Sequence, residues 1–199
     1  IFISLLLTKS TISFSQQSAK DRIEEYFRLN KEKINQNVAI NWEINKTVAN
    51  AKNNIVHHYI HQTLFGLPIV NSTALFVEKG DKFILTGNRL LDSEVPIPEK
   101  ENAKSASMCL NDAWEQLTGE KPSTKNVNHV PLKGNGWIEN PDYSKEKITA
   151  TLAYFFDGEN IRFIYEINLK MKDGLHWWNL YVDAKTGELL KKINWTVSC

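Results

Sequence analysis

The chain is poor in cysteine and lacks a long hydrophobic run at its start, and these absences exclude several classes of protein. Cys109 and Cys199 are the only cysteines in 199 residues, which excludes a disulfide framework and a cysteine-rich zinc site. A single 109–199 disulfide stays open, as does a Cys109 that packs as a small apolar residue beside a helix. The apolar run at residues 1–7 is too short to span a bilayer. We therefore expect no stable membrane insertion.

A surplus of charge of one sign is also lacking. The chain has 24 Lys and Arg against 23 Asp and Glu, a net charge of +1. Without a broad basic surface, a nucleic-acid partner is excluded. The length allows one large domain or two small ones.

Motifs of catalysis are absent from the sequence. None of the five histidines is followed by Glu, so there is no His-Glu-x-x-His, and no Gly-x-Ser-x-Gly occurs. His57 and His61 have the i, i+4 spacing of metal ligands on a helix, but their neighbours favour a strand. A Ser-His-Asp or Cys-His triad stays open, because its members meet only in space. We expect no catalytic residue, metal site or cofactor in this chain.

The first residues have the pattern of a secretory signal. The apolar run is followed by small and polar residues, with Ser13 and Ser15 at the small-residue positions of a cleavage site. We interpret residues 1–15 as the remnant of a signal peptide and expect a secreted, extracellular protein. Because an initiator Met and a basic segment are lacking, we expect a truncated N-terminus. The alternative is an apolar strand of the mature protein.

The first half of the chain predicts a helix followed by strands. Ser18 and Asp21 have capping-box spacing, and apolar residues recur at helical spacing over residues 19–35. Residues 40–44 predict a short strand and residues 45–54 a polar linker. Three β-runs follow at residues 59–64, 69–77 and 83–86, separated by turns at 65–68 and 80–81.

The second half repeats this order. The prolines in residues 95–98 indicate a linker, and an apolar stripe over residues 103–117 predicts a helix that Gly119 ends. Residues 123–147 predict a loop. Alternating runs at 148–156 and 161–169, and a further run at 176–182, predict an antiparallel meander. A helix followed by such a meander is typical of an α+β fold in which the helix covers a sheet.

Two segments resemble a known family. Gln62-Thr63, Gly66, the run Pro68-Ile-Val-Asn71 and the later Gly87-Asn-Arg89 are similar to the fungalysin/thermolysin propeptide domain. Residues 162–167, 176–182 and 183–190 resemble the PepSY-type module that follows it in such propeptides. The residues after Asn194 are similar to the approach to the catalytic domain in bacterial fungalysin-type precursors. The resemblance covers nearly all of residues 40–199.

This resemblance implies a fold and a division of the chain. The fold class is α+β, with two small cystatin- or PepSY-like units in tandem, each an antiparallel sheet covered by a helix. The helix and lead-in strand occupy residues 16–54, the propeptide-like domain residues 55–95, and the PepSY-like module residues 99–199.

The resemblance also implies a function. The chain would be the prosegment of a secreted zinc metalloendopeptidase, assisting the folding of its own catalytic domain in cis and inhibiting it until proteolytic removal. Zinc would belong to that missing catalytic domain. One alternative is a free-standing exported module that binds or inhibits peptidases, and another is an envelope-associated structural or ligand-binding domain.

Candidate contact residues come from the propeptide-like hairpin around residues 58–71 and from the C-terminal stretch at residues 175–199. Neighbouring tryptophans on a strand point to opposite faces, so one of Trp177 and Trp178 is expected in the core and the other at an interface. Cys199 is a speculative thiol that would block the partner's zinc. The candidate contact surface comprises His58, Tyr59, Gln62, Gly66, Pro68, Asn71, Trp177 and Trp178.

Overall fold

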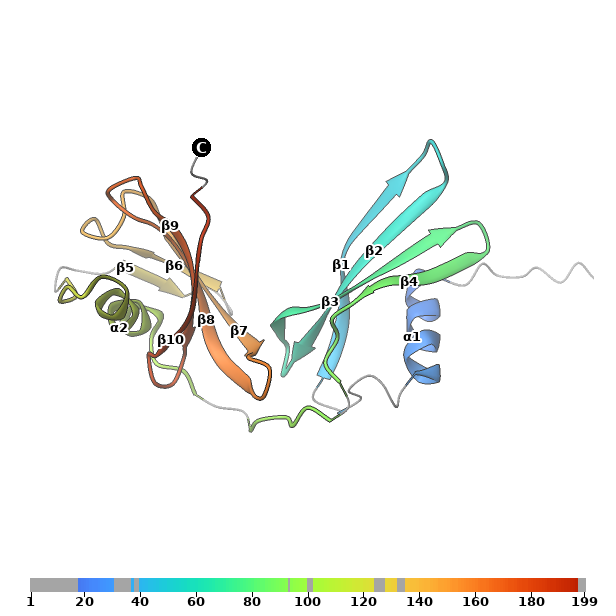
Figure 1. Cartoon of the computed structure of the whole chain (residues 1–199), viewed down its shortest axis with the longest axis horizontal. Coiled ribbons are helices and arrows are strands. Elements are labelled where there is room, and N and C mark those ends of the chain that lie inside the picture. Colours follow the sequence, from blue (N-terminus) through green and yellow to red (C-terminus); the bar gives the residue numbers. More distant parts are fainter. Residues whose placement is uncertain are drawn as a thin grey trace, which may run out of the picture.

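A computed structural model describes residues 18–30, 37, 40–92, 94–99, 102–123, 128–131 and 135–196 of the chain. Two helices and ten strands follow one another in the order shown in Figure 1. The elements are α1 (Ala19–Leu29), β1 (Ile40–Asn50), β2 (Ile55–Leu64), β3 (Leu67–Lys79), β4 (Lys82–Asn88), α2 (Ala106–Thr118), β5 (Asn128–Pro131), β6 (Asn135–Glu139), β7 (Ile148–Phe156), β8 (Ile161–Lys170), β9 (Trp177–Asp183) and β10 (Leu189–Asn194).

Helix α1 begins at the predicted capping box. The hydroxyl of Ser18 accepts from the backbone N–H of Asp21, whose carboxylate accepts from the N–H of Ser18, each over 3.1 Å. Its apolar stripe, Ile23 and Phe27, is buried against Phe76 and other residues of the sheet. The helix ends at Leu29, six residues before the predicted end, and residues 31–36 lie outside the described part.

The predicted break at residues 65–68 is a two-residue hairpin turn. Leu64 pairs with Leu67 across the antiparallel β2–β3 ladder, so Phe65 and Gly66 form the loop. Both have positive φ, 50° and 81°, which is the backbone of a type I′ turn and suits the twist of the two strands. Strand β3 then continues to Lys79 and pairs with β4.

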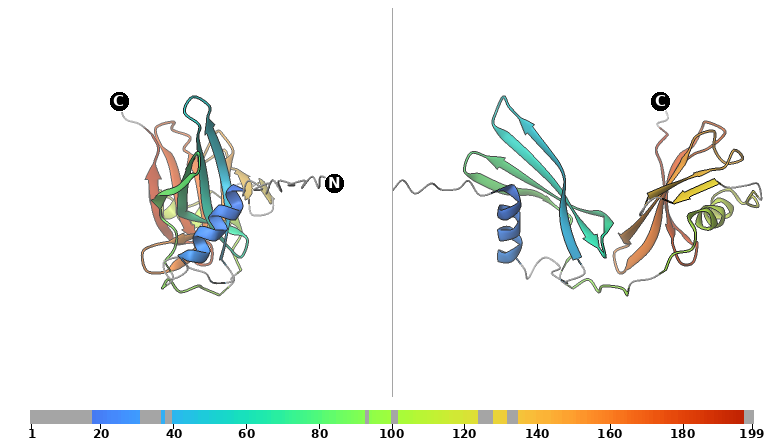
Figure 2. Two further views of the ribbon diagram at one scale, coloured as in Figure 1. Left: turned by 90° about the vertical axis from the view of Figure 1, so that its right-hand side faces the viewer. Right: turned by 180° about the vertical axis from the view of Figure 1, so that it is seen from behind.

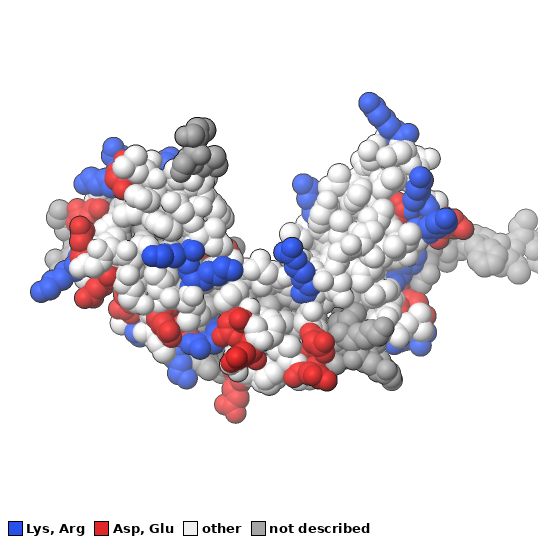
Figure 3. All heavy atoms as spheres, viewed as in Figure 1, with Lys and Arg blue, Asp and Glu red and all other residues white. Residues whose placement is uncertain are grey.

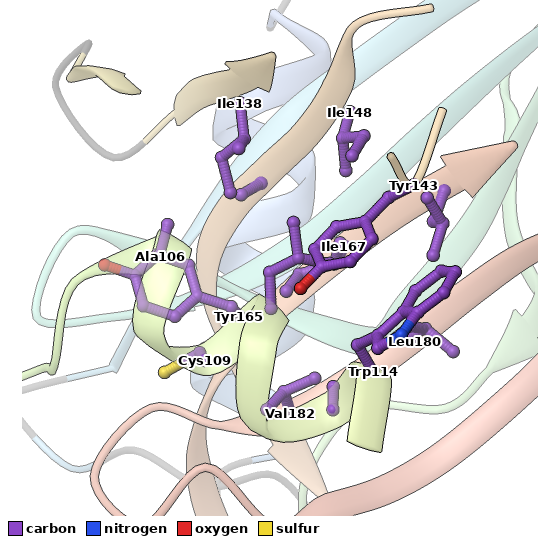
Figure 4. Packing of buried hydrophobic residues seen from close by; sticks show 14 of the residues in the cluster. Ala106, Cys109, Trp114, Ile138, Tyr143, Ile148, Tyr165, Ile167, Leu180 and Val182 are labelled. Carbon is purple, nitrogen blue, oxygen red and sulfur yellow. The ribbon is translucent and has the colours of Figure 1, made fainter. Parts of the chain in front are cut away.

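Helix α2 covers the larger core. Its N-cap is Ser105, whose hydroxyl accepts from the N–H of Met108. Its C-cap is Gly119, with φ of 76°, where the sequence predicted the end of the helix. Trp114 stacks on Tyr143 with ring centroids 4.2 Å apart. Figure 4 shows how the helix lies over side chains of the sheet, including Ile148, Ile167, Leu180 and Val182.

Strands β3 and β7 join the two halves into one sheet. They pair in parallel through two registers only, Ile69 with Tyr154 and Val70 with Phe155. Ile69 and Tyr154 are buried in a cluster with Leu64, against which Val95 and Ile97 of the linker pack. The resulting path runs β1-β2-β3-β7-β8-β9-β10, with β4 on β3, and β6 on β7 with β5 beyond it.

The predicted fold class is wrong. We expected two α+β units in tandem, each an antiparallel sheet covered by a helix. The strands instead form a single ten-stranded mixed sheet, and the helices have only 11 and 13 residues. The parallel link between β3 and β7 overturns the prediction. It joins residues more than 80 positions apart, and no local pattern reveals such a pairing.

Two local predictions were also wrong. Residues 45–50 belong to strand β1 rather than to a polar linker, and β5 and β6 lie inside the predicted loop of residues 123–147. Strand β1 is exposed at every residue from Glu43 to Asn50, so it lacks the alternation of apolar and polar residues by which a half-buried strand is recognised.

Candidate functional site: the open face of the sheet

Both helices lie on the same face of the sheet. The face is continuous through the junction, because Leu64 of the α1 side shares a buried cluster with Tyr154 of the α2 side. The opposite face, called here the open face, carries no described helix. Figure 2 shows α1 and α2 on the two outer sides of the bent sheet. A sheet face without a helix or second sheet leaves its apolar side chains available to a partner.

The N-terminal part of the open face is formed by β1, β2, β3 and β4. Cross-strand partners point to the same face, and the registers Val48–His57, Lys46–Tyr59 and Val77–Ile84 place these side chains opposite α1. Tyr59 is 41% exposed, and Val48 and Ile84 are exposed as well. This part therefore offers apolar contacts on an uncovered sheet.

The C-terminal part of the open face is dominated by two tryptophans. Trp177 and Trp195 contact each other edge to face, with ring centroids 5.5 Å apart, and are 41% and 46% exposed. The indole N–H of Trp177 donates to Oδ1 of Asn168 over 2.6 Å, and its backbone N–H donates to the hydroxyl of Thr196. The Trp177 ring is thus oriented by Asn168 and by contact with Trp195, while both rings stay partly accessible.

Between these two parts, a small cluster of side chains on the open face is buried. It consists of Ala153, Ile164 and Tyr181, against which Val70 of β3 packs. Burial and the nearby carboxylate of Glu166 raise the pKa of the Tyr181 phenol, although a hydrogen bond with the Asn71 side chain lowers it in part. The phenol is therefore a neutral hydrogen-bonding group that links β9 to β3 at neutral pH.

Asn71 has the backbone conformation that this junction needs. Its φ is 65°, a left-handed value that Asn tolerates better than most residues. Asn71 directly follows Ile69 and Val70, which pair with β7. Two residues later, at Thr73, β3 pairs with β2 again after a register shift.

Figure 3 shows the molecular surface hollowed between the two halves of the sheet.

The structure separates the predicted contact residues into exposed and buried groups. Tyr59 and Trp177 lie exposed on the open face, and Asn71 is exposed at the junction. Gly66 is exposed in the hairpin turn, and Pro68 is half-buried beside it. These positions are open to a partner.

The remaining predicted contact residues point away from the open face. Trp178 packs against the α2 cluster and stacks on His176, with ring centroids 5.7 Å apart. His58 and Gln62 are buried on the side of α1. They therefore support the fold rather than a contact surface. Cys199 lies outside the described residues.

His58 belongs to a polar cluster that ties α1 to the sheet. Its Nε2 lies 3.3 Å from Glu78, its Nδ1 lies 3.2 Å from the hydroxyl of Thr47, and Arg22 of α1 pairs with Glu78 over 2.5 Å. Burial alone would raise the pKa of Glu78, but hydrogen bonds from Arg22 and His58 outweigh it and keep the pKa low. The carboxylate stays charged and holds the helix.

Sequence reasoning missed Val48 and Ile84, and it included Trp195 only as part of the candidate stretch at residues 175–199. Val48 lay in a predicted linker, Ile84 in a short run, and Trp195 beyond the last predicted strand. One signal could have singled out Trp195 within that stretch, because a second tryptophan just after the neighbouring strand can join one of Trp177 and Trp178 at an interface. Val48 and Ile84 carried no such signal, because their face depends on strand registers.

Among the described residues, no group of three or more His, Cys, Asp or Glu side chains is placed to hold a metal ion. His57 and His61 lie on strand β2, and His61 is 3.9 Å from Glu43. Neither described helix is long and apolar enough to cross a membrane.

Comparison with known proteins gives no family. No protein-family model matches the chain, and no curated protein matches it.

Proposed function

We propose that this chain is a prosegment-like module that binds a secreted zinc metalloendopeptidase, chaperoning its folding and inhibiting it until the segment is removed. The observation that carries the proposal is the open face, a long sheet surface with exposed Tyr59, Trp177 and Trp195 and without a described covering element. Aromatic residues of this kind are the usual anchors of protein interfaces. The similarity of residues 62–71 and 162–190 to fungalysin-type propeptides names the class of partner.

The physical logic of a prosegment fits a surface of this shape. A partner domain in the same chain would be held at a high effective concentration, so even a modest interface would stay formed. Two exposed aromatic regions on either side of a hollow would hold the partner at two points. Cutting the connection would remove the concentration advantage and let the peptidase dissociate.

Inhibition in trans tests the proposal. The purified chain is titrated into a mature fungalysin-type zinc peptidase that hydrolyses a fluorogenic peptide. We expect inhibition at micromolar concentration, and we expect Trp177→Ala to weaken it by about thirtyfold, since an aromatic anchor contributes about 2 kcal/mol.

The control variant is Met108→Ala. Met108 is exposed on α2, on the opposite face of the sheet, so its truncation removes a comparable apolar side chain without touching the open face. If the chain fails to inhibit at micromolar concentration, or if Met108→Ala weakens inhibition as much as Trp177→Ala does, the proposal is wrong.

A further inference from the structure

Four lysines on the open face lack acidic partners among the described residues. The registers Lys46–Tyr59 and Lys191–Tyr181 place these two lysines on the open face, one in each half of the sheet. Lys79 and Lys82 are cross-strand neighbours at the β3–β4 hairpin, and their side chains also lie on this face. Among the described residues, none of the four forms an ion pair, so their charges are available to a partner.

Two carboxylates of the same face contact side chains other than these lysines. Glu166 accepts from the side-chain amide of Asn179 over 2.8 Å, and Glu43 lies 3.9 Å from His61. Lys170 also lies on the open face, as the cross-strand partner of Trp177, but it pairs with Glu146. Lys104, before α2, pairs with Asp112. Within the described part of the chain, Lys46, Lys79, Lys82 and Lys191 thus add four unpaired positive charges to the open face, although the whole chain has a net charge of only +1.

Lys191 is held in place by aromatic rings. Its ammonium lies 5.6 Å from the ring centroid of Phe155 and 5.8 Å from that of Tyr181. Such cation–π contacts orient the charge without neutralising it. Lys192, the next residue, lies over Trp178 on the opposite face. Two neighbouring lysines thus point to opposite sides of strand β10.

The space-filling view shows the same distribution. In Figure 3, Lys and Arg side chains lie on both sides of the hollow, whereas Asp and Glu lie below it and on the outer sides of the two halves. A concave surface of one sign attracts a partner of the opposite sign and raises its rate of association.

We infer that the open face receives a surface of a protein partner that is rich in Asp and Glu, with Lys46 and Lys191 contacting carboxylates from the two sides of the hollow. The inference deepens the proposed function and rests on it for the identity of the partner. It fixes the chemistry of that partner: acidic side chains around an apolar patch that covers Trp177 and Tyr59.

Charge reversal in a binding experiment tests the inference. Binding of the peptidase to the chain is measured by surface plasmon resonance at 50 and 300 mM NaCl. We expect Lys191→Glu to weaken binding about fivefold at low salt, mainly through the association rate, and Lys191→Arg to leave it unchanged. Lys192→Glu makes the same change of charge on the opposite face and is expected to have little effect.

A second probe separates this inference from the proposed function. Poly-L-glutamate is titrated into the chain, with single-stranded DNA as a competing polyanion. Poly-L-glutamate binding that Lys191→Glu lowers and Lys192→Glu spares supports an acidic partner even if no peptidase binds, in which case only the proposed function fails.

Three outcomes would overturn the inference. The first is peptidase binding that neither salt nor Lys191→Glu alters, which would leave the proposed function standing. The second is equal loss in Lys191→Glu and Lys192→Glu. The third is DNA that displaces poly-L-glutamate as well as poly-L-glutamate itself does, because the face would then recognise polyanions in general.

Discussion

Gln62 and Ser72 lie on neighbouring strands and share a buried hydrogen bond, in which the hydroxyl of Ser72 donates to Oε1 of Gln62 over 2.5 Å. The same oxygen accepts from the backbone N–H of Leu91 over 2.8 Å. The Gln62 side chain therefore links β2, β3 and the segment after β4. This link lies next to the residues of β3 that pair with β7 instead of β2. The sequence singled out Gln62 as a contact residue, and the structure gives it this internal position instead.

Replacing Gln62 by Leu should destabilise the fold. Two buried donors, the Ser72 hydroxyl and the Leu91 N–H, would lose their acceptor, and each unsatisfied group costs about 1–3 kcal/mol. We expect a loss of about 3 kcal/mol in the free energy of unfolding, measured by urea denaturation. Ser72→Ala removes one partner only and should cost less. Equal stability of Gln62→Leu and the wild type would contradict this role.

Gly187 should not tolerate a side chain. Its φ is 84°, and an added Cβ would overlap the Asp112 side chain of α2. Gly187→Ala would therefore combine backbone strain with displacement of the α2 contact, and we expect a loss of more than about 2 kcal/mol. Gly158 provides the control, because its φ is also positive, 111°, but a Cβ there meets open space. Thermal denaturation should rank Gly187→Ala well below Gly158→Ala.

Acid should weaken the turn between β9 and β10 through Asp183. Burial alone would raise the pKa of this carboxyl, but hydrogen bonds from the backbone N–H of Thr186 and from Arg162 outweigh it and hold the pKa below its usual range. A lowered pKa in the folded state contributes stability above the unfolded pKa of about 3.9, and this stability is lost as the pH falls through the folded value.

We therefore expect Asp183→Asn to be less stable than the wild type at pH 7, by about 2 kcal/mol. The difference should shrink as the pH falls below about 4, where the wild-type carboxyl becomes protonated. Urea unfolding between pH 7 and pH 2.5 measures both curves. A difference that stays constant across this range would show that the charge of Asp183 contributes nothing.

Cys109 should be unreactive in the folded protein. Burial raises the pKa of its thiol to about 11, and the nearby carboxylate of Asp112 adds to this. Since the thiolate is the reactive form, alkylation at pH 8 should be slow. In a Cys199→Ser variant, iodoacetamide should label Cys109 after denaturation and not before, as mass spectrometry would show. Rapid labelling of the native protein would contradict the buried position.

The sequence predicted local structure well where residues decide it locally. The capping box at Ser18, the end of α2 at Gly119 and the turn at Phe65-Gly66 each depend on a few neighbouring residues. The alternation in β8 reflects burial on one face, so its strand was also predicted.

The global arrangement could not be predicted in the same way. The parallel contact of Ile69 with Tyr154 depends on tertiary packing, so two separate units were expected where one sheet forms. The open face was predicted only in part for a similar reason. Tyr59 and Trp177 were expected at a surface, whereas the face shared by Val48, Ile84 and Trp195 follows from strand registers that no single segment encodes.

The most direct measurement is amide hydrogen exchange of the chain with and without a mature fungalysin-type zinc peptidase. Exchange into deuterium is followed by mass spectrometry of peptides from each element. If the open face binds the peptidase, protection should appear at its exposed edge strands, β1 and β10, and be absent from α1 and α2. Protection confined to the helices, or none at micromolar peptidase, would contradict the account.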